Sequence, residues 1–202
     1  MRLHSPPGFI QSLFSVATWK RTTDKKVIYL TFDDGPTPII TRKILDILQC
    51  WNAKATFFCL GKQVENHPDI FAQIITEGHA IGNHTYSHLN AWKTPGKIYL
   101  NDIDKCGMVF RSTLFRPPYG CLPLSHLSEI RKKYKIIMWS LMSYDFDPEL
   151  SPGKISRIFL KRGAPGQIWL FHDNEISSLN CLKVLPELLQ KFTDRGYSFH
   201  KL

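Results

Sequence analysis

The feature that most constrains the fold of this chain is an apolar run that ends in two adjacent carboxylates, Asp33 and Asp34. The continuous run over residues 27–32 is typical of a strand buried on both faces, as in a parallel sheet. Gly35 and Pro36 then break the chain, which places both carboxylates at the carboxyl end of the strand. Catalytic and ligand-binding residues of α/β sheets and barrels gather at that end. Neighbouring strand-end residues point in different directions, so one carboxylate can bind a metal ion while the other accepts a proton.

Strand-like and helix-like runs alternate along the rest of the chain. After the first strand, we predict further strands at residues 55–60, 79–83, 114–115, 134–140, 167–171 and 197–200. We predict helices at residues 37–50, 68–76, 97–109, 124–133, 152–160 and 182–192. This alternation indicates an α/β domain of about seven parallel strands joined by right-handed crossovers. The pattern leaves open whether the sheet is doubly wound or closed as a barrel.

Residues 1–24 precede this domain, which we place at residues 25–202. In this segment Phe9, Ile10, Leu13, Phe14 and Ala17 fall on one face of a short helix, which we expect to pack on the domain. An alternative is that the helix lies at a membrane surface, aided by basic charge.

Charge and cysteine content restrict the partners and the compartment. The chain has 26 Lys and Arg against 17 Asp and Glu, a net charge of +9, which favours anionic partners but also serves ordinary solubility. No nucleic-acid-binding motif accompanies the charge, so we expect no nucleic-acid partner, and we allow association with a membrane surface or the cell envelope. Five cysteines without CxxC spacing indicate buried free thiols and a reducing compartment. The chain shows no secretory pattern and no apolar run near the ~20 residues of a membrane span, so we expect a cytoplasmic or peripheral membrane location.

Reactive side chains follow directly on apolar runs in distant parts of the chain. These residues are Asp33, Asp34, His84, His88, Arg116, Asp145 and His172. Because parallel strands bring their carboxyl ends to one rim, we expect these side chains to converge in space.

His84 and His88 have the i, i+4 spacing that lets two imidazoles bind one metal ion. Taken alone, this spacing also suits capping or core histidines. Two histidines and one carboxylate are the protein ligands of many catalytic zinc sites, and Asp34 is the natural third ligand. A water bound to such a zinc ion can lose its proton near pH 7 and act as a nucleophile.

Hydrolysis of an amide or ester also needs a base, an oxyanion donor and an acid. Asp33 suits the base, with the Arg116 guanidinium to orient it. The alternative for Arg116 is a surface ion pair. Residues 117–118 are both proline and stiffen the backbone, so the Tyr119 N–H suits a fixed oxyanion donor.

His172 suits the general acid, with Asp145 keeping it protonated. As alternatives, His172 could lie beside a helix cap and Asp145 could form a turn before a proline. Several independent coincidences would be needed for all of these alternatives to hold at once.

From about residue 26 to 202 the sequence resembles the polysaccharide deacetylases, the NodB-homology domain of carbohydrate esterase family four. Five family motifs occur in order, at residues 31–36 (TFDDGP), 84–88 (HTYSH), 116–120 (RPPYG), 145–146 (DF) and 170–173 (LFHD). The resemblance implies that Asp33 is the catalytic base, that the metal ligands are Asp34, His84 and His88, and that His172 is the acid. It also implies that Arg116 orients the base, that Asp145 tunes the acid, and that the Tyr119 N–H faces the oxyanion.

The same resemblance implies an irregular (β/α) barrel. Phe146 stands where the family usually has Trp, and Trp169 stands where Leu is common; we expect both to line the acetyl or sugar pocket beside Pro118 and Tyr119.

The sequence thus predicts a metal-dependent hydrolase that removes N-acetyl groups from an amino sugar, such as N-acetylglucosamine in a polysaccharide, oligosaccharide or glycolipid. The expected cofactor is Zn²⁺, with Co²⁺ or another divalent transition metal as the alternative. Alternative functions are an O-acetyl esterase or a small-amide amidohydrolase with the same site, and a catalytically silent carbohydrate-binding protein.

Overall fold

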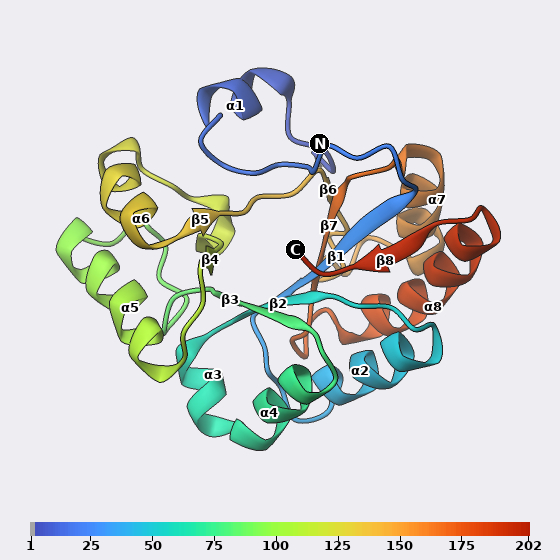
Figure 1. Cartoon of the computed structure of the whole chain (residues 1–202), viewed down its shortest axis with the longest axis horizontal. Helices are drawn as coiled ribbons and strands as arrows, with labels where there is room; N and C mark the ends of the chain where they lie inside the picture. Colours follow the sequence, from blue (N-terminus) through green and yellow to red (C-terminus); the bar gives the residue numbers. More distant parts are fainter. Residues whose placement is uncertain (1–2) are drawn as a thin grey trace.

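The computed structural model describes residues 3–202 and is built on a parallel sheet that curls into an incomplete barrel (Figure 1). Its strands are β1 (Val27–Asp33), β2 (Thr56–Cys59), β3 (Ala80–Asn83), β4 (Leu114–Phe115), β5 (Lys135–Ile136), β6 (Leu141–Met142), β7 (Ile168–His172) and β8 (Ser198–His200). They pair in the order β5-β4-β3-β2-β1-β7-β6, with β8 beside the start of β1. The predicted (β/α) barrel of parallel strands is confirmed, and the doubly wound alternative is excluded.

In Figure 1 the helices surround the sheet, and each of them packs one of its faces against the outside of the sheet. They are α2 (Ile40–Cys50), α3 (Gly61–Asn66), α4 (Pro68–Thr76), α5 (Gly96–Val109), α6 (Leu127–Lys133), α7 (Pro152–Arg162) and α8 (Ser178–Asp194), with 3₁₀ turns at Pro118–Gly120 and Leu124–His126. In α2 the buried residues Ile44, Leu45 and Leu48 recur with helical spacing. Burial of such stripes against the sheet forms the main core.

Strand β7 separates this core from the interior of the barrel. The Trp169 side chain is fully buried and packs edge-on against Phe159 and Phe192, each with ring centroids 4.8 Å apart. His172 lies three residues further along the strand, and an odd offset places two residues on opposite faces. Since His172 lines the same cleft as Asp33 and Asp34, and Trp169 does not, the expectation that Trp169 lines this pocket is wrong.

The predicted strand at residues 134–140 is also wrong in extent. Only Lys135–Ile136 pairs as a strand, and β6 follows separately, so the sheet has eight strands where about seven were predicted. The carbonyls of Ile137 and Met138 accept hydrogen bonds from the buried Arg116 side chain, and the Met138 N–H donates to Thr18. The Ile137 and Ser140 N–H groups donate to Phe115 of β4 and Ile168 of β7, so the backbone between β5 and β6 has mixed partners and forms no regular strand.

The amino-terminal segment bridges the opening between the sheet edges. The Thr18 N–H donates to the Ile136 carbonyl and the Arg21 N–H donates to the Gly166 carbonyl, each at 2.8 Å. Further out, Met142 N–H donates to the His4 carbonyl, also at 2.8 Å. These bonds tie residues 4–21 to both sides of the gap.

Helix α1 (Gly8–Leu13) of this segment is shorter than the amphipathic pattern suggested. Ile10 and Phe14 pack on a core cluster that includes the buried Ala17, whereas Phe9 and Leu13 are exposed. The five residues expected on one face therefore divide between core and surface. Residues 1 and 2 of the predicted segment lie outside the described residues.

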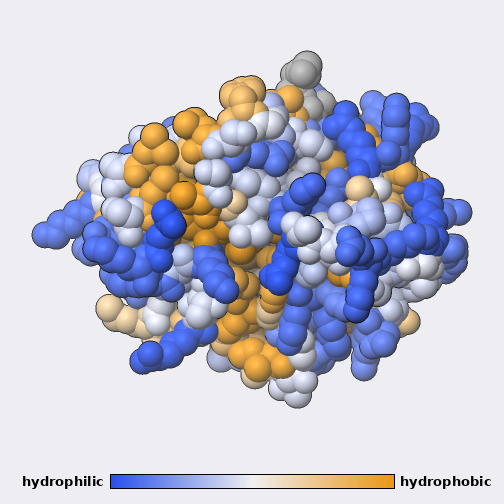
Figure 2. All heavy atoms as spheres, turned by 45° about the horizontal axis from the view of Figure 1, so that its top comes forward, coloured by the Kyte–Doolittle hydropathy of each residue, from blue (hydrophilic) through white to orange (hydrophobic). Residues whose placement is uncertain are grey.

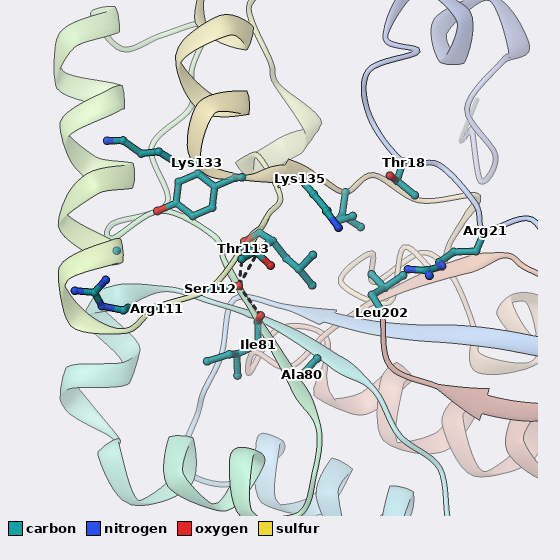
Figure 3. A pocket seen from close by; sticks show the side chains of 14 residues that line it. Thr18, Arg21, Ala80, Ile81, Arg111, Ser112, Thr113, Lys133, Lys135 and Leu202 are labelled. Atoms are coloured by element: carbon teal, nitrogen blue, oxygen red, sulfur yellow. Dashed lines mark hydrogen bonds between the residues drawn. The ribbon is translucent and has the colours of Figure 1, made fainter.

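A depression of about 770 Å³ lies beside the first residues of β3, β4 and β5, at the end of the barrel opposite the carboxylates (Figure 3). Its lining includes Arg21 and Lys135, together with apolar residues such as Ile81 and Leu202. Figure 2 shows a face that is mostly hydrophilic and is hollowed at its centre, where apolar side chains lie between hydrophilic ones.

The five cysteines are free thiols; four are buried and Cys50 is exposed. Within residues 3–202, no helix has the length and apolar character needed to span a membrane.

Candidate metal centre and catalytic cleft

Strands β4, β3, β1 and β7 deliver the reactive side chains to one end of the barrel. Asp33 and His172 are paired in register on β1 and β7, while His84 directly follows β3 and Arg116 directly follows β4. A cleft of about 600 Å³ opens at this end. Its lining includes Asp33, Asp34, His84, His88, Tyr119, Phe146 and His172.

Asp34, His84 and His88 bring three potential metal-ligand atoms within 4.8 Å of one another. The Asp34 Oδ1 atom lies 3.5 Å from His84 Nε2 and 3.1 Å from His88 Nε2. This is the cluster that the sequence predicted.

The surroundings of the three residues suit a metal ion. His84 Nδ1 lies 2.8 Å from the Arg116 carbonyl, so it carries the proton and leaves the Nε2 lone pair facing Asp34. His88 Nδ1 lies 3.1 Å from the Tyr119 hydroxyl. Asp34 Oδ1 is buried and accepts no hydrogen bond within residues 3–202. Lone pairs that converge without a proton between them need a cation, and one carboxylate with two imidazoles matches the ligands of a divalent transition metal such as zinc.

The backbone around the cleft adopts conformations that most residues avoid. Asp34, His88, Tyr119 and Tyr144 all line the cleft and have φ values of 86°, 60°, 59° and 53°. Each such left-handed residue costs about 1–3 kcal/mol, and such residues cluster at functional sites. Contacts from elsewhere in the molecule must therefore hold these loops.

Asp102 of α5 holds the loop that presents the two histidines. Its carboxylate accepts hydrogen bonds from the N–H groups of Tyr86 and Ser87, at 3.1 and 3.0 Å, and from the Ser87 hydroxyl at 2.6 Å. The loop between His84 and His88 is thus attached to a helix of the barrel wall.

Asp173 holds the turn that follows Asp34. It accepts hydrogen bonds from the Gly35 N–H at 2.9 Å and from the Thr41 hydroxyl at 2.6 Å. Burial raises the pKa of Asp173 to about 7, with the Thr41 hydrogen bond opposing the rise. Gly35 is required here because a Cβ atom would lie 1.8 Å from Asp173 Oδ2.

Arg116 is fully buried and fixes the orientation of Asp33. Its Nη1 donates to Asp33 Oδ1 at 2.7 Å and to the Thr31 hydroxyl at 2.8 Å, and its guanidinium stacks 4.1 Å from the centre of the Phe58 ring. Asp33 Oδ2 lies 3.8 Å from His84 Nε2. One oxygen of Asp33 is therefore bound by the guanidinium, and the other faces the candidate metal centre.

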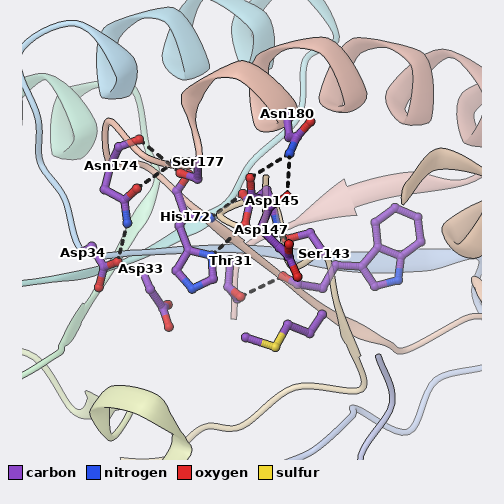
Figure 4. Close-up of polar contacts among 12 residues, drawn as sticks. Thr31, Asp33, Asp34, Ser143, Asp145, Asp147, His172, Asn174, Ser177 and Asn180 are labelled. Carbon is purple, nitrogen blue, oxygen red and sulfur yellow. Dashed lines mark hydrogen bonds and ion pairs between the residues drawn. The ribbon is translucent and has the colours of Figure 1, made fainter. Parts of the chain in front are cut away.

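Asp145 holds His172 from behind (Figure 4). Asp145 Oδ1 lies 2.8 Å from His172 Nδ1, and Oδ2 accepts the His172 backbone N–H at 2.9 Å. Ser143 and Asn180 donate to Asp145 at 2.8 and 3.0 Å and keep it in place. Burial alone would lower the pKa of His172, but the Asp145 carboxylate outweighs it and raises the pKa to about 9. A protonated imidazole with Nε2 directed into the cleft can donate a proton near neutral pH.

The four residues predicted to surround the substrate do not all line the cleft. Tyr119 is exposed at the rim, and Phe146 lines the cleft with its ring edge-on to His172 at 5.1 Å. Pro118 is buried and does not line the cleft, whereas Pro117 does, because the 3₁₀ turn at Pro118–Gly120 directs Pro118 inward. Of the four residues expected around the substrate, Tyr119 and Phe146 line the cleft, whereas Pro118 and Trp169 do not.

Three residues that sequence reasoning did not assign to the site support it. Asn174 donates its side-chain N–H to Asp34 Oδ2 at 2.7 Å and lines the cleft, while Asp102 and Asp173 hold the two ligand-bearing loops. Asn174 and Asp173 directly follow His172 at a strand end, which was the available signal. Asp102 lies in the middle of a predicted helix, where a polar residue gives no such signal.

A family model described as polysaccharide deacetylase matches residues 20–136. A peptidoglycan-N-acetylglucosamine deacetylase of Bacillus cereus is 33% identical over 204 residues, which cover 96% of this chain and 91% of that protein. A chitooligosaccharide deacetylase of Azorhizobium caulinodans is 35% identical over 75% of this chain and 76% of its own length. The peptidoglycan-N-acetylmuramic acid deacetylase PdaC of Bacillus subtilis is 33% identical, but the match covers only 37% of its length.

Among solved structures, a peptidoglycan N-acetylglucosamine deacetylase in complex with 4-naphthalen-1-yl-N-oxidanyl-benzamide superimposes with a TM-score of 0.89 and 31% identity. The superposition covers 98% of this chain and 95% of that one. The amino-terminal segment and the barrel are therefore both included in the similarity.

Proposed function

The chain belongs to the polysaccharide deacetylase family, and from that premise we propose that it removes N-acetyl groups from an amino sugar such as N-acetylglucosamine. One observation carries the proposal: the three-residue metal cluster lies beside Asp33, whose Oδ1 atom is bound by Arg116, and His172, whose Nδ1 atom is bound by Asp145. Metal-assisted hydrolysis of an amide needs these parts within reach of one bond.

Asp34, His84 and His88 would hold the metal ion. When bound there, a divalent transition metal supplies a Lewis acid that polarises the acetamide carbonyl and lowers the pKa of the attacking water. Zinc suits a set of two imidazoles and one carboxylate, and cobalt accepts the same ligands.

The side chains around the metal centre divide the proton transfers between them. Asp33 takes a proton from the attacking water through its free oxygen, and Arg116 keeps that carboxylate oriented. The Tyr119 backbone N–H donates to the carbonyl oxygen as negative charge develops on it. His172 gives its Nε2 proton to the amine nitrogen as the C–N bond breaks, which leaves acetate and a free amino sugar.

An assay of acetate release tests this function. Chelator-treated enzyme and zinc-restored enzyme are compared on N-acetylglucosamine oligomers, O-acetylated sugars and small acetamides. We expect release from the N-acetylglucosamine oligomers that stops with the chelator and returns with zinc. Release from O-acetylated sugars or small amides alone would keep the hydrolytic site but replace the substrate. The absence of release from every compound by zinc-loaded enzyme would favour a carbohydrate-binding protein.

We propose a reducing location, in the cytoplasm or on the membrane surface facing it, because all five cysteines are free thiols. Fractionation of the producing cells tests this proposal. Recovery of the active protein from the culture medium would contradict it.

A further inference from the structure

The catalytic cleft lies beside a second cavity of about 320 Å³. Four residues line both spaces: Tyr119, Gly120, Trp139 and Tyr144. The second cavity therefore adjoins the space in which the acetamide group of a substrate would lie.

The walls of this second cavity are apolar. Ile10 and Phe14 of the amino-terminal segment form one side, Leu122 and Met138 form part of the other, and Trp92 at the surface is 70% exposed. Among the described residues that line the cavity, none has a charged side chain. Pockets of this size and composition bind apolar ligand groups.

Trp139 stands at the junction of the two spaces. Its indole Nε1 atom is buried and has no hydrogen-bond partner in the described part of the chain. The ring is packed closely on Gly120, where a Cβ atom would lie 2.7 Å from it, so the ring position is fixed. A buried donor without a partner is unfavourable.

A polysaccharide chain does not match this cavity well. Each sugar ring carries several hydroxyl groups, and their burial requires hydrogen-bonding partners. The apolar side chains of Ile10, Phe14, Leu122 and Met138 offer none. An alkyl or acyl chain attached to the sugar through one oxygen would match the apolar walls.

We propose that the second cavity holds an apolar chain attached to the amino sugar, so that the preferred substrate is an N-acetylated amino sugar glycolipid. This inference rests on the proposed deacetylase function. It adds a specificity site, formed largely by the amino-terminal segment, to the catalytic cleft.

Steady-state kinetics with two soluble substrates test the inference. Hexyl and methyl β-N-acetylglucosaminide differ only in the apolar chain. We expect kcat/KM to be at least about ten-fold higher for the hexyl glycoside, because each buried methylene contributes favourably. Trp92→Ala, at an exposed position, and Ile10→Asn should lower this ratio toward one. Leu13→Asn changes an exposed residue on the same helix that does not line the cavity, and it should leave the ratio unchanged.

Equal kcat/KM values for the two glycosides, with measurable turnover, would overturn the inference and leave the deacetylase function intact. A larger gain for the N-acetylglucosamine trimer than for the hexyl glycoside, lost in Trp92→Ala, would also overturn it and identify a sugar subsite.

Binding provides a readout that does not depend on turnover. Calorimetry with the deacetylated hexyl and methyl β-glucosaminides should give a Kd at least about ten-fold lower for the hexyl compound. Equal Kd values would contradict the inference even for an inactive preparation. Tighter hexyl binding by zinc-loaded enzyme that releases acetate from none of the N-acetylated sugars would support the apolar site and refute the deacetylase function.

Discussion

At the scale of single residues, each reactive side chain of the cleft has one atom bound by a neighbour and one atom left free. Arg116 binds Oδ1 of Asp33, the Arg116 carbonyl binds Nδ1 of His84, and Asp145 binds Nδ1 of His172. The free atoms are Oδ2 of Asp33 and Nε2 of both histidines. The direction of each group is thus set before a substrate arrives, which is a condition for efficient acid–base catalysis.

The first residue-scale prediction concerns Asp33. We expect Asp33→Asn to lower kcat by about 10³-fold or more, because an amide cannot accept the proton of the attacking water. Its zinc content, measured by elemental analysis, should stay at the wild-type value because the three ligands are unchanged. Asp46→Asn makes the same chemical change on the exposed surface of α2 and should have no effect. Wild-type turnover by Asp33→Asn would refute the role of the base.

The second prediction concerns the pH dependence set by His172. Since its pKa is raised to about 9, the proton donor is present below that pH and is lost as the pH rises through it. The kcat/KM profile should therefore fall on the alkaline side near pH 9. In Asp145→Asn the largest of the raising influences is removed, while those of Asp34 and Asp33 remain, so the alkaline limb should move to lower pH by about one pH unit or more. An alkaline limb that stays in place would show that another group titrates.

The reactive residues could be predicted from sequence because each follows an apolar run, which fixes its place at the rim. Trp169 was misplaced because matching a motif position does not say which face of a strand a side chain occupies. Asn174 was not recognised because an amide two residues after a strand also suits an ordinary turn. Only the folded turn shows that it donates to Asp34.

At the scale of secondary-structure elements, helices outside the cleft determine its geometry. Asp102 of α5 binds the loop between the two histidines through three hydrogen bonds. That loop contains Thr85 and His88, with φ values of 69° and 60°. The helix therefore stabilises a loop conformation that the loop residues alone disfavour.

The element-scale prediction follows from this attachment. Asp102→Ala should weaken zinc affinity by about 10–100-fold, since supporting hydrogen bonds of metal ligands contribute at this level. Asp104→Ala removes a carboxylate from the same helix, one that pairs with Lys133 at the surface, and should leave the affinity unchanged. Both variants are measured by competition with a fluorescent zinc chelator. Equal affinities in the two variants would contradict the supporting role of Asp102.

The positions of helices and strands were predictable where apolar residues recur with the period of the element and form its buried face. The helix at Pro68–Thr76 agrees with its predicted bounds, and α5 starts one residue earlier than expected. The interruption of the strand within residues 134–140 was not predictable because part of this backbone bonds to the Arg116 side chain and to Thr18, which lie far away in the sequence. An apolar run alone cannot reveal such partners.

At the scale of the whole molecule, the barrel is incomplete and its gap is bridged by the amino-terminal segment. The alternation of strands and helices indicated a parallel sheet. Closure of the barrel, however, depends on hydrogen bonds from Thr18 and Arg21, and no local sequence pattern predicts these bonds. The same segment borders the apolar cavity beside the cleft. Closure of the fold and shape of the substrate site are therefore linked through residues 4–21.

The most direct test of the central claim is a zinc titration of chelator-stripped protein, followed by the initial rate of N-acetylglucosamine oligomer deacetylation. Asp34, His84 and His88 form the only such ligand cluster within residues 3–202, so the rate should rise from near zero and saturate at about one zinc ion per chain. A rate that is already maximal in metal-free protein, and that added zinc does not change, would contradict the account.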